Sequence, residues 1–195
     1  ADLHLRDVAL ASLTERERRI LHGRMSDGLL ERRKTMQEQL GRLQSERRDD
    51  NGSEQRRQLP REARRRELLE AFDRALVHHL RAAHRPLEAA RFLARWARRE
   101  FEATPRDQYG EIATAFTAAE VTRHADVLLA GLLTADPDYE LAAVSRAEVS
   151  LLVTAARARA LMERFDLADQ YAERAFQKAR TLGDGALTAR VLAER

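Results

Sequence analysis

Residues 109–137 read YGEIATAFTAAEVTRHADVLLAGLLTADP and carry the clearest structural pattern in this chain of 195 residues. Apolar and small side chains recur there at three- and four-residue spacing, which is the period of an α-helix. One proline stands shortly before the stretch and another closes it, and proline favours helix boundaries. The pattern predicts one helix over 106–119 and a second over 122–134. Ala113 and Ala125 are small enough to let these two helices pack closely.

The helical pattern continues toward both ends of the chain. Thr14 and Glu17 have the spacing of a capping box, in which each side chain accepts a hydrogen bond from the other residue's backbone amide. Ser26 offers a second helix start, and Ser145 with Glu148 offers a third. No segment alternates apolar and polar residues over the length of a strand, so the sequence predicts helices throughout.

Further helices are expected over 59–84, 87–103 and 167–182, and a short one over 138–144. The first of these carries apolar residues at helical spacing, which are Leu68, Leu69, Phe72, Leu76 and Leu80. The pair Gly183-Asp184 is typical of a helix end followed by the cap of a final helix.

The composition excludes several classes of protein. Apolar residues make up 44% of the chain and charged residues 34%, so a core can form beneath a highly charged surface. Cysteine is absent, which excludes disulfides, thiolate metal sites and cysteine nucleophiles. No stretch approaches the roughly 18 apolar residues of a membrane span, so none is expected.

The pattern of residues 109–137 resembles the tetratricopeptide repeat (TPR). The matching positions are Tyr109, Ile112, Ala113 and Phe116 in the first helix, Ala125 in the second, and Pro137 at the end of the unit. Looser resemblance covers 68–104 and 146–195. Pentatricopeptide and other helical-hairpin repeats give a similar pattern, and an irregular helical bundle with alanine-rich contacts is the alternative.

The resemblance implies an all-α fold, a TPR-like helical-hairpin superhelix of the α-solenoid type. A charged N-terminal helical hairpin precedes it. We predict three parts, namely this hairpin over 1–50, a polar loop over 51–59, and the TPR-like repeat domain over 60–195.

In the TPR family the first helix of each pair lines a groove that binds partners. The resemblance therefore implies a partner-binding groove at Asp107, Gly110, Thr114, Thr117 and Ala118. The basic and polar clamp with which chaperone-binding TPR proteins hold a terminal carboxylate is missing from these positions. Binding of chaperone tails is therefore not expected.

A basic patch lies before the repeat domain. Its members are Arg56, Arg57, Arg61, Arg64, Arg65 and Arg66. Such a stripe suits phosphates or an acidic protein surface, although a solvated helix face would have the same composition. Residues 107–148 hold eight acidic residues and two arginines, so this segment and the patch could meet different partners or each other in self-association.

No catalytic pattern is visible in the sequence. We therefore expect that the protein is not an enzyme and that it has neither a cofactor nor a metal site. The chain has no glycine-rich phosphate loop and no nucleophile elbow. His78, His79 and His84 are close in sequence but lack the spacing of a known metal motif. We expect them to be solvated or to interact with the C-terminal end of their helix.

These observations favour a non-catalytic protein–protein interaction module, such as an adaptor, scaffold or accessory subunit of a multisubunit assembly. One alternative is a helical-repeat protein that binds nucleic acid through the arginine stripe 56–66. Another is the regulatory arm of a bacterial transcription regulator, because 151–195 resembles helix pairs in the TPR domains of such regulators. The expected location is the cytoplasm or an organellar matrix.

Overall fold

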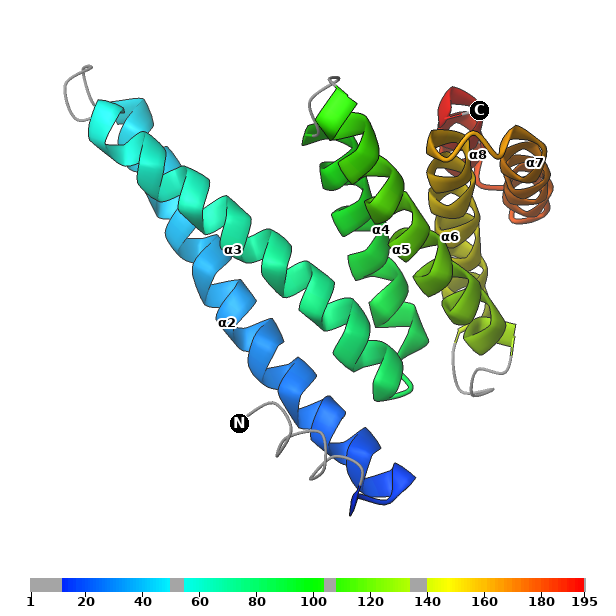
Figure 1. The fold of residues 1–195 in the computed structure, drawn as a ribbon, viewed down its shortest axis with the longest axis horizontal. Helices are drawn as coiled ribbons and strands as arrows, with labels where there is room; N and C mark the ends of the chain where they lie inside the picture. The colour runs from blue at the N-terminus through cyan, green and yellow to red at the C-terminus, as the bar shows by residue number, and fades with distance from the viewer. Residues whose placement is uncertain (1–11, 50–54, 104–107, 134–139, 195) are drawn as a thin grey trace. The chain divides into compact units, whose positions relative to one another are not determined.

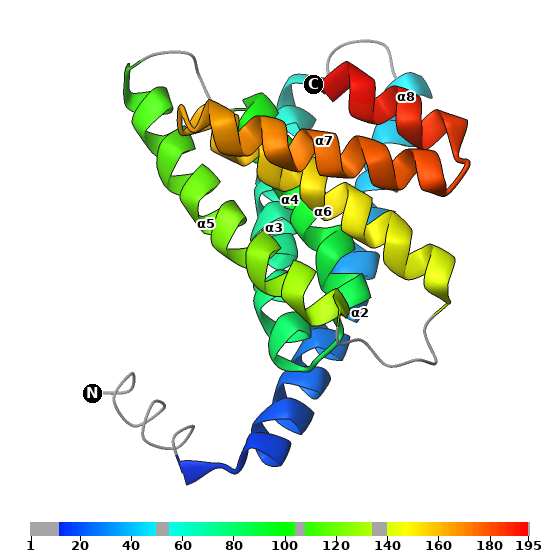
Figure 2. The ribbon, with the colours of Figure 1, turned by 90° about the vertical axis from the view of Figure 1, so that its right-hand side faces the viewer.

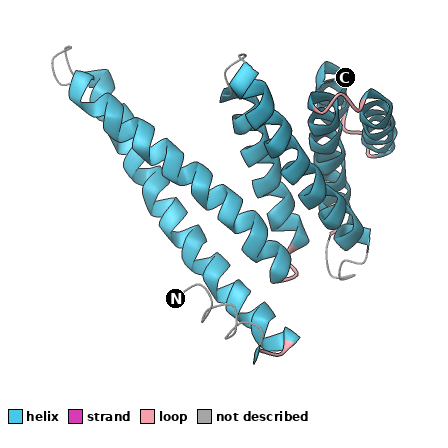
Figure 3. Cartoon of the chain, in the orientation of Figure 1, coloured by secondary structure: helices cyan, strands magenta, loops and turns pink. Residues whose placement is uncertain are grey.

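The computed structural model describes residues 12–49, 55–103, 108–133 and 140–194, and within them every regular element is a helix (Figure 3). In chain order the helices are α2 (Glu15–Asp49), α3 (Gln55–Ala82), α4 (Pro86–Ala103), α5 (Gln108–Leu133), α6 (Leu141–Leu161), α7 (Phe165–Thr181) and α8 (Gly185–Glu194). The prediction of an all-α protein is confirmed. Among the described helices, none combines the length and apolar character needed to cross a bilayer.

The chain divides into two compact units, Ala1–His84 and Arg85–Arg195. In the first unit, α2 and α3 pack side by side as a long helical hairpin (Figure 1). The predicted capping box at the start of α2 is confirmed. The Glu17 amide donates to Thr14 Oγ1 over 3.2 Å, and the Thr14 amide donates to Glu17 Oε2 over 2.8 Å.

Helix α2 runs through Ser26 without a break, so the predicted helix start at that residue is wrong. Ser26 is fully buried, and its hydroxyl donates to the Gly23 carbonyl over 2.7 Å. A serine can bond to its own helix as well as cap one, and the sequence pattern does not distinguish the two.

The hairpin extends further along the chain than the sequence indicated. We predicted a hairpin over 1–50 and a separate repeat domain from residue 60, but the division between units falls after His84. Helix α3 contacts α2, and its apolar face is buried at Leu69, Leu76 and Leu80. That face was predicted to start the repeat domain, whereas in the structure it belongs to the hairpin.

The second unit contains α4 to α8. Helix α4 contacts α5 and α6, and α6 also contacts α5, α7 and α8. Figure 2 shows α7 lying along α6. The core of this unit combines two large aromatic rings, Phe92 and Trp96, with many small side chains. The buried alanines are Ala89, Ala90, Ala97, Ala118, Ala125, Ala155, Ala158, Ala168, Ala175 and Ala179. Small side chains let neighbouring helices approach closely.

Helix α5 is continuous over the stretch that was predicted to hold two helices, so the predicted division between 106–119 and 122–134 is wrong. Residues 114–124 contain neither glycine nor proline, so nothing in them interrupts the backbone hydrogen bonds. Ala125 is fully buried as expected, but it shares one helix with Ala113 and cannot face it across a crossing. Phe116, one of the positions that match the repeat pattern, is 75% exposed.

Two helix starts were predicted near the end of the chain, and one is wrong while the other is confirmed. Helix α6 begins at Leu141, and Ser145 is buried within it, so the predicted start at Ser145 is wrong. At the end of α7, Gly183 has a φ of 65°, the left-handed conformation that glycine favours. Asp184 then caps α8, because its Oδ1 accepts from the Leu187 amide over 3.0 Å.

Candidate partner-binding groove

The predicted groove residues lie on α5, except Asp107, which is outside the described residues. Ala118 is fully buried, so its side chain does not line an open groove, and that part of the prediction is wrong. Thr114 and Thr117 are half-buried. Gly110 belongs to α5, but its surroundings lie outside the description. A role for these other residues in binding stays a prediction.

The predicted basic patch falls on the first part of α3. Of its six members, Arg64 is exposed and Arg65 is half-buried. The side chains of the other four lie outside the described part of the structure, and these are Arg56, Arg57, Arg61 and Arg66. The patch therefore also stays a prediction.

A different surface of the second unit carries a shallow, open hollow. It lies between α4, α6 and α8, and its volume of about 20 Å³ is room for about one water molecule. The lining residues are Ala94, Ala97, Arg98 and Phe101 of α4, Val153, Thr154 and Arg157 of α6, and Arg190 of α8. We call this surface the α4–α6–α8 hollow.

Each of the three helices contributes one arginine to the hollow, namely Arg98, Arg157 and Arg190. No aspartate or glutamate is among the lining residues. Glu102 lies beside the hollow, with its Oε1 3.9 Å from Arg98 Nε. Three guanidinium groups around one hollow create a positive potential that favours carboxylates or phosphates.

The floor of the hollow is apolar. Ala97 is buried, and Ala94 and Val153 are half-buried. Thr154 is also buried, and its hydroxyl donates to the Ser150 carbonyl over 2.8 Å, so it adds no unpaired polar group to the floor. The Arg157 guanidinium lies above the Phe101 ring, with its Cζ 5.7 Å from the ring centroid. A cation over an aromatic face is held in place by the ring's electrostatic field. The hollow thus combines an apolar floor with a basic rim, a pattern that suits a peptide with apolar and acidic side chains.

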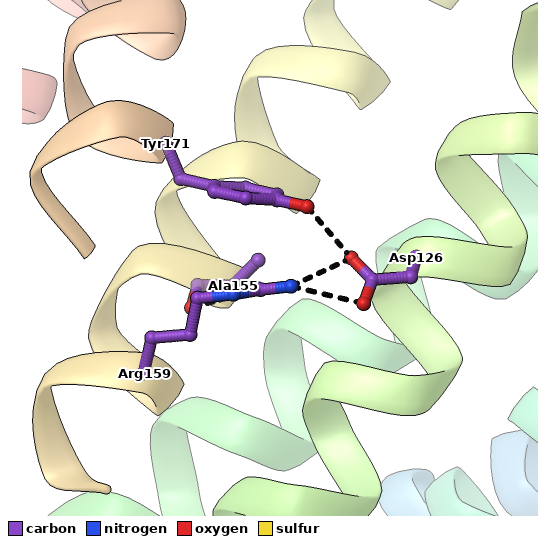
Figure 4. Close-up of polar contacts among 4 residues, drawn as sticks. All are labelled: Asp126, Ala155, Arg159 and Tyr171. Atoms are coloured by element: carbon purple, nitrogen blue, oxygen red, sulfur yellow. Dashed lines mark hydrogen bonds and ion pairs between the residues drawn. The ribbon is translucent and has the colours of Figure 1, made fainter. Parts of the chain in front are cut away.

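A polar contact among α5, α6 and α7 positions the middle helix of the hollow (Figure 4). Arg159 Nη2 donates to both carboxylate oxygens of Asp126, each over 2.9 Å. The Tyr171 hydroxyl donates to Asp126 Oδ1 over 3.0 Å. The Arg159 guanidinium also stacks on the Tyr171 ring, with its Cζ 3.8 Å from the centroid.

This contact changes the chemistry of the tyrosine. Burial raises the pKa of Tyr171, and the hydrogen bond to Asp126 raises it further. Arg159 is buried, and an ion pair with its hydrogen bonds satisfied holds one arrangement of the helices in place. Because Arg159 belongs to α6, the contact fixes the helix that carries Arg157.

Sequence reasoning missed the three arginines of the hollow. They lie on helices far apart in the chain, and each alone is an ordinary surface arginine of an arginine-rich sequence. Once the helix pairs are assigned as α4 with α5 and α6 with α7, the three fall on alternate helices. This alternation could have identified the three arginines in the sequence. It was not recognised because two helices were predicted in place of α5.

Comparison with known proteins adds no assignment. No protein-family model matches the sequence, and searches of curated proteins and of solved structures give no match either.

Proposed function

We propose that this chain is a non-catalytic protein–protein interaction module whose second unit binds an acidic segment of a partner protein in the α4–α6–α8 hollow. The observation that carries the proposal is the presence of Arg98, Arg157 and Arg190, one from each of three alternate helices, around an apolar floor. An extended or helical peptide can place apolar side chains on the floor and carboxylates against the guanidinium groups.

The contacts between helices support a helical-hairpin arrangement of the TPR-like, α-solenoid type. If α4 pairs with α5 and α6 with α7, then α8 occupies the place of the first helix in a third pair. The contacts of α4 with α6 and of α6 with α8 suit stacked pairs whose first helices form one face. On this proposal the hollow corresponds to the groove of such repeats, and α4 with α5 forms one pair in place of the pair predicted within 109–137.

The chemistry of the hollow favours a protein over a nucleic acid. Proteins that bind nucleic acid tightly often neutralise about six to ten phosphates, whereas the hollow offers three arginines. Phe101 is the one aromatic side chain among its lining residues, and the Arg157 guanidinium lies above that ring, so little surface is left for stacking bases. Acidic peptides need fewer charges and gain from apolar contacts.

The experiment measures the fluorescence anisotropy of labelled peptides in which glutamate alternates with leucine. The test variant reverses the three arginines of the hollow, Arg98→Glu, Arg157→Glu and Arg190→Glu. The control reverses Arg91, Arg123 and Arg164, which are exposed arginines elsewhere in the same unit. Both variants change the net charge equally.

We expect the test variant to bind at least about 30-fold more weakly than the parent, because like charges then face each other. The control should bind within about threefold of the parent. Equal losses in both variants would refute the proposal, since binding would then follow net charge alone. RNA that binds the parent more tightly than the peptides and is unaffected in the test variant would favour the nucleic-acid alternative.

A further inference from the structure

Three histidines meet between the two helices of the hairpin. His22 comes from α2, and His78 and His79 come from α3. One nitrogen of each ring can be chosen so that the three lie within 4.8 Å of one another. The ring centroids are 5.0 to 5.6 Å apart. His78 and His79 are close to His84 in sequence, but in the structure their neighbour is His22, which the sequence pattern did not indicate.

Two of the rings already point at a common site. His22 Nδ1 and His79 Nδ1 are 2.8 Å apart and share a hydrogen bond, whose direction depends on the tautomers. A bond of this kind places one proton between two nitrogen lone pairs. A metal ion takes the place of such a proton when it binds both nitrogens.

The hairpin is what completes the cluster. Neighbouring residues of a helix point about 100° apart, so His78 and His79 alone converge poorly on one ion. His22 lies near the start of α2 and the other two near the end of α3, about equally far from the connection between the helices. The cluster is therefore at the open end of the hairpin, where a shared ligand would join the two helices.

We propose that His22, His78 and His79 bind a divalent transition-metal ion of the zinc class, with solvent as the fourth ligand. Three imidazoles with one open position is a known coordination set for zinc. Zinc–nitrogen bonds of about 2.0–2.1 Å place tetrahedral ligands about 3.3 Å apart. To reach this spacing, the His22 and His79 nitrogens must separate slightly from 2.8 Å, and any pair of ligand nitrogens at the 4.8 Å limit of the cluster must approach.

The ligand chemistry selects the class of ion. Imidazole nitrogen suits zinc, copper, nickel and cobalt, whereas magnesium and calcium require oxygen ligands. His22 and His79 are half-buried, and His78 is exposed, so the cluster is open to ions from solution. An ion that binds the folded hairpin but not the unfolded chain stabilises the fold by mass action.

The test uses the full chain without a polyhistidine tag. Zinc is titrated and followed by calorimetry, and cobalt is titrated and followed by visible absorption. The parent is compared with His22→Gln, which removes the only ligand from α2, and with His84→Gln, an exposed histidine outside the cluster. Glutamine keeps the size and polarity of the side chain and removes the strong nitrogen ligand.

We expect one zinc ion per chain in the parent and in His84→Gln, with a cobalt absorption band in the visible range. In His22→Gln the affinity should fall at least about 100-fold, since losing a ligand exceeds the 10- to 100-fold effect of losing an outer-shell partner. Zinc should raise the melting temperature of the parent and of His84→Gln, and not that of His22→Gln.

The proposal is overturned if the parent binds no zinc, if His22→Gln binds as tightly as the parent, or if His84→Gln loses as much affinity as His22→Gln. Circular dichroism checks that each variant is folded. If His22→Gln is unfolded, the exposed His78 takes its place, and His78→Gln must show the same loss of affinity.

Discussion

The hairpin of α2 and α3 and the unit of α4 to α8 differ in what they bury. Among the described residues, three of the seven buried side chains in the hairpin are polar or charged, against three of 23 in the second unit. The buried residues of the hairpin are Leu69, Leu76, Val77 and Leu80, with Ser26, Arg33 and Asp73. The hairpin therefore depends more on a few specific polar contacts, and the second unit more on close packing of small side chains.

The difference follows from the number of neighbours that each helix has. In the hairpin, α2 and α3 bury one face each against the other. A narrow apolar stripe fixes the pairing of two long helices weakly, whereas a buried ion pair fixes it at one position. In the second unit, α6 contacts α4, α5, α7 and α8, so its small side chains are covered from several directions.

The largest effect is expected at the ion pair of the hairpin. Arg33 Nε donates to Asp73 Oδ1 over 2.5 Å, and the Asp73 side chain is fully buried. Burial also lowers the pKa of Arg33. Asp73→Ala leaves the buried guanidinium without its carboxylate and should destabilise the protein by about 3–5 kcal/mol. Urea unfolding followed by circular dichroism measures this change.

The double variant Arg33→Met with Asp73→Leu is the control, because it removes both charges and keeps apolar volume. It should recover most of the lost stability. A loss below about 1 kcal/mol in Asp73→Ala would show that the pair behaves as a surface ion pair, and the contrast between the two units would then fail.

An intermediate effect is expected from overpacking in the second unit. Ala125 is fully buried on α5, so Ala125→Leu should destabilise this unit by about 1–3 kcal/mol. Ala130 is an exposed alanine of the same helix, and Ala130→Leu should change stability by less than about 0.5 kcal/mol. Fluorescence of the single tryptophan, the buried Trp96, reports the unfolding of this unit. Equal melting temperatures of Ala125→Leu and Ala130→Leu would contradict close packing around Ala125.

A smaller effect is expected at the contact between α5, α6 and α7. Tyr171→Phe removes the hydroxyl that donates to Asp126 and keeps the ring beneath Arg159, so it should cost about 0.5–1.5 kcal/mol. The pKa of Tyr171 is raised above its ordinary value of 10.0. The contribution of the protonated hydroxyl to the free energy of unfolding is therefore fully present below about pH 10. It is lost as the pH rises through the higher pKa of the folded state.

Tryptophan-monitored unfolding at pH 8 and pH 10.5 tests this dependence. Between pH 8 and pH 10.5 the free energy of unfolding of the parent should fall by more than that of Tyr171→Phe. The difference in stability between the two proteins should therefore narrow. The other tyrosines are present in both proteins, so they cancel in the comparison. A difference that widens with pH would contradict the raised pKa.

The smallest effect is expected at the start of α2. Hydrogen bonds from the Thr14 hydroxyl and amide lower the pKa of Glu17. The cap is therefore complete above the ordinary pKa of about 4.5, and is lost as the pH falls through the lower value. Protection of the first-turn amides, taken relative to the exchange of an unstructured chain at the same pH, should fall on acidification in the parent. In Thr14→Ala this protection should be low at every pH, and a protection equally pH-dependent in both proteins would contradict the role of the cap.

The sequence was sufficient for the fold class and for two of the helix caps. Thr14 and Asp184 act as predicted because each stands where a polar residue precedes a helical pattern. Ser26 and Ser145 carry the same local signal but lie inside helices, where the Ser26 hydroxyl bonds to its own helix backbone. Local spacing therefore identifies possible caps, and burial by other helices decides which are used.

The candidate groove could not be predicted because it depends on how the helices pair. Dividing α5 in two paired its halves with each other, and the predicted groove fell on a helix whose Ala118 is buried. The predicted boundary of the hairpin is wrong for a related reason, because the apolar face of α3 could pack either against α2 or against the helices of a repeat. The arginines of the α4–α6–α8 hollow and the histidine cluster each bring together residues from separate helices, and such contacts depend on pairing.

Hydrogen exchange with bound peptide tests whether the hollow binds the peptide, because it reports both units in one experiment. The parent is compared with and without a saturating glutamate–leucine peptide, and exchange is resolved by mass spectrometry of fragments. The proposed binding mode predicts slower exchange in α4, α6 and α8 around Arg98, Arg157 and Arg190, with exchange in α2 and α3 unchanged. Slower exchange confined to 55–66, with none around the hollow, would contradict it and assign binding to the arginine stripe of the hairpin.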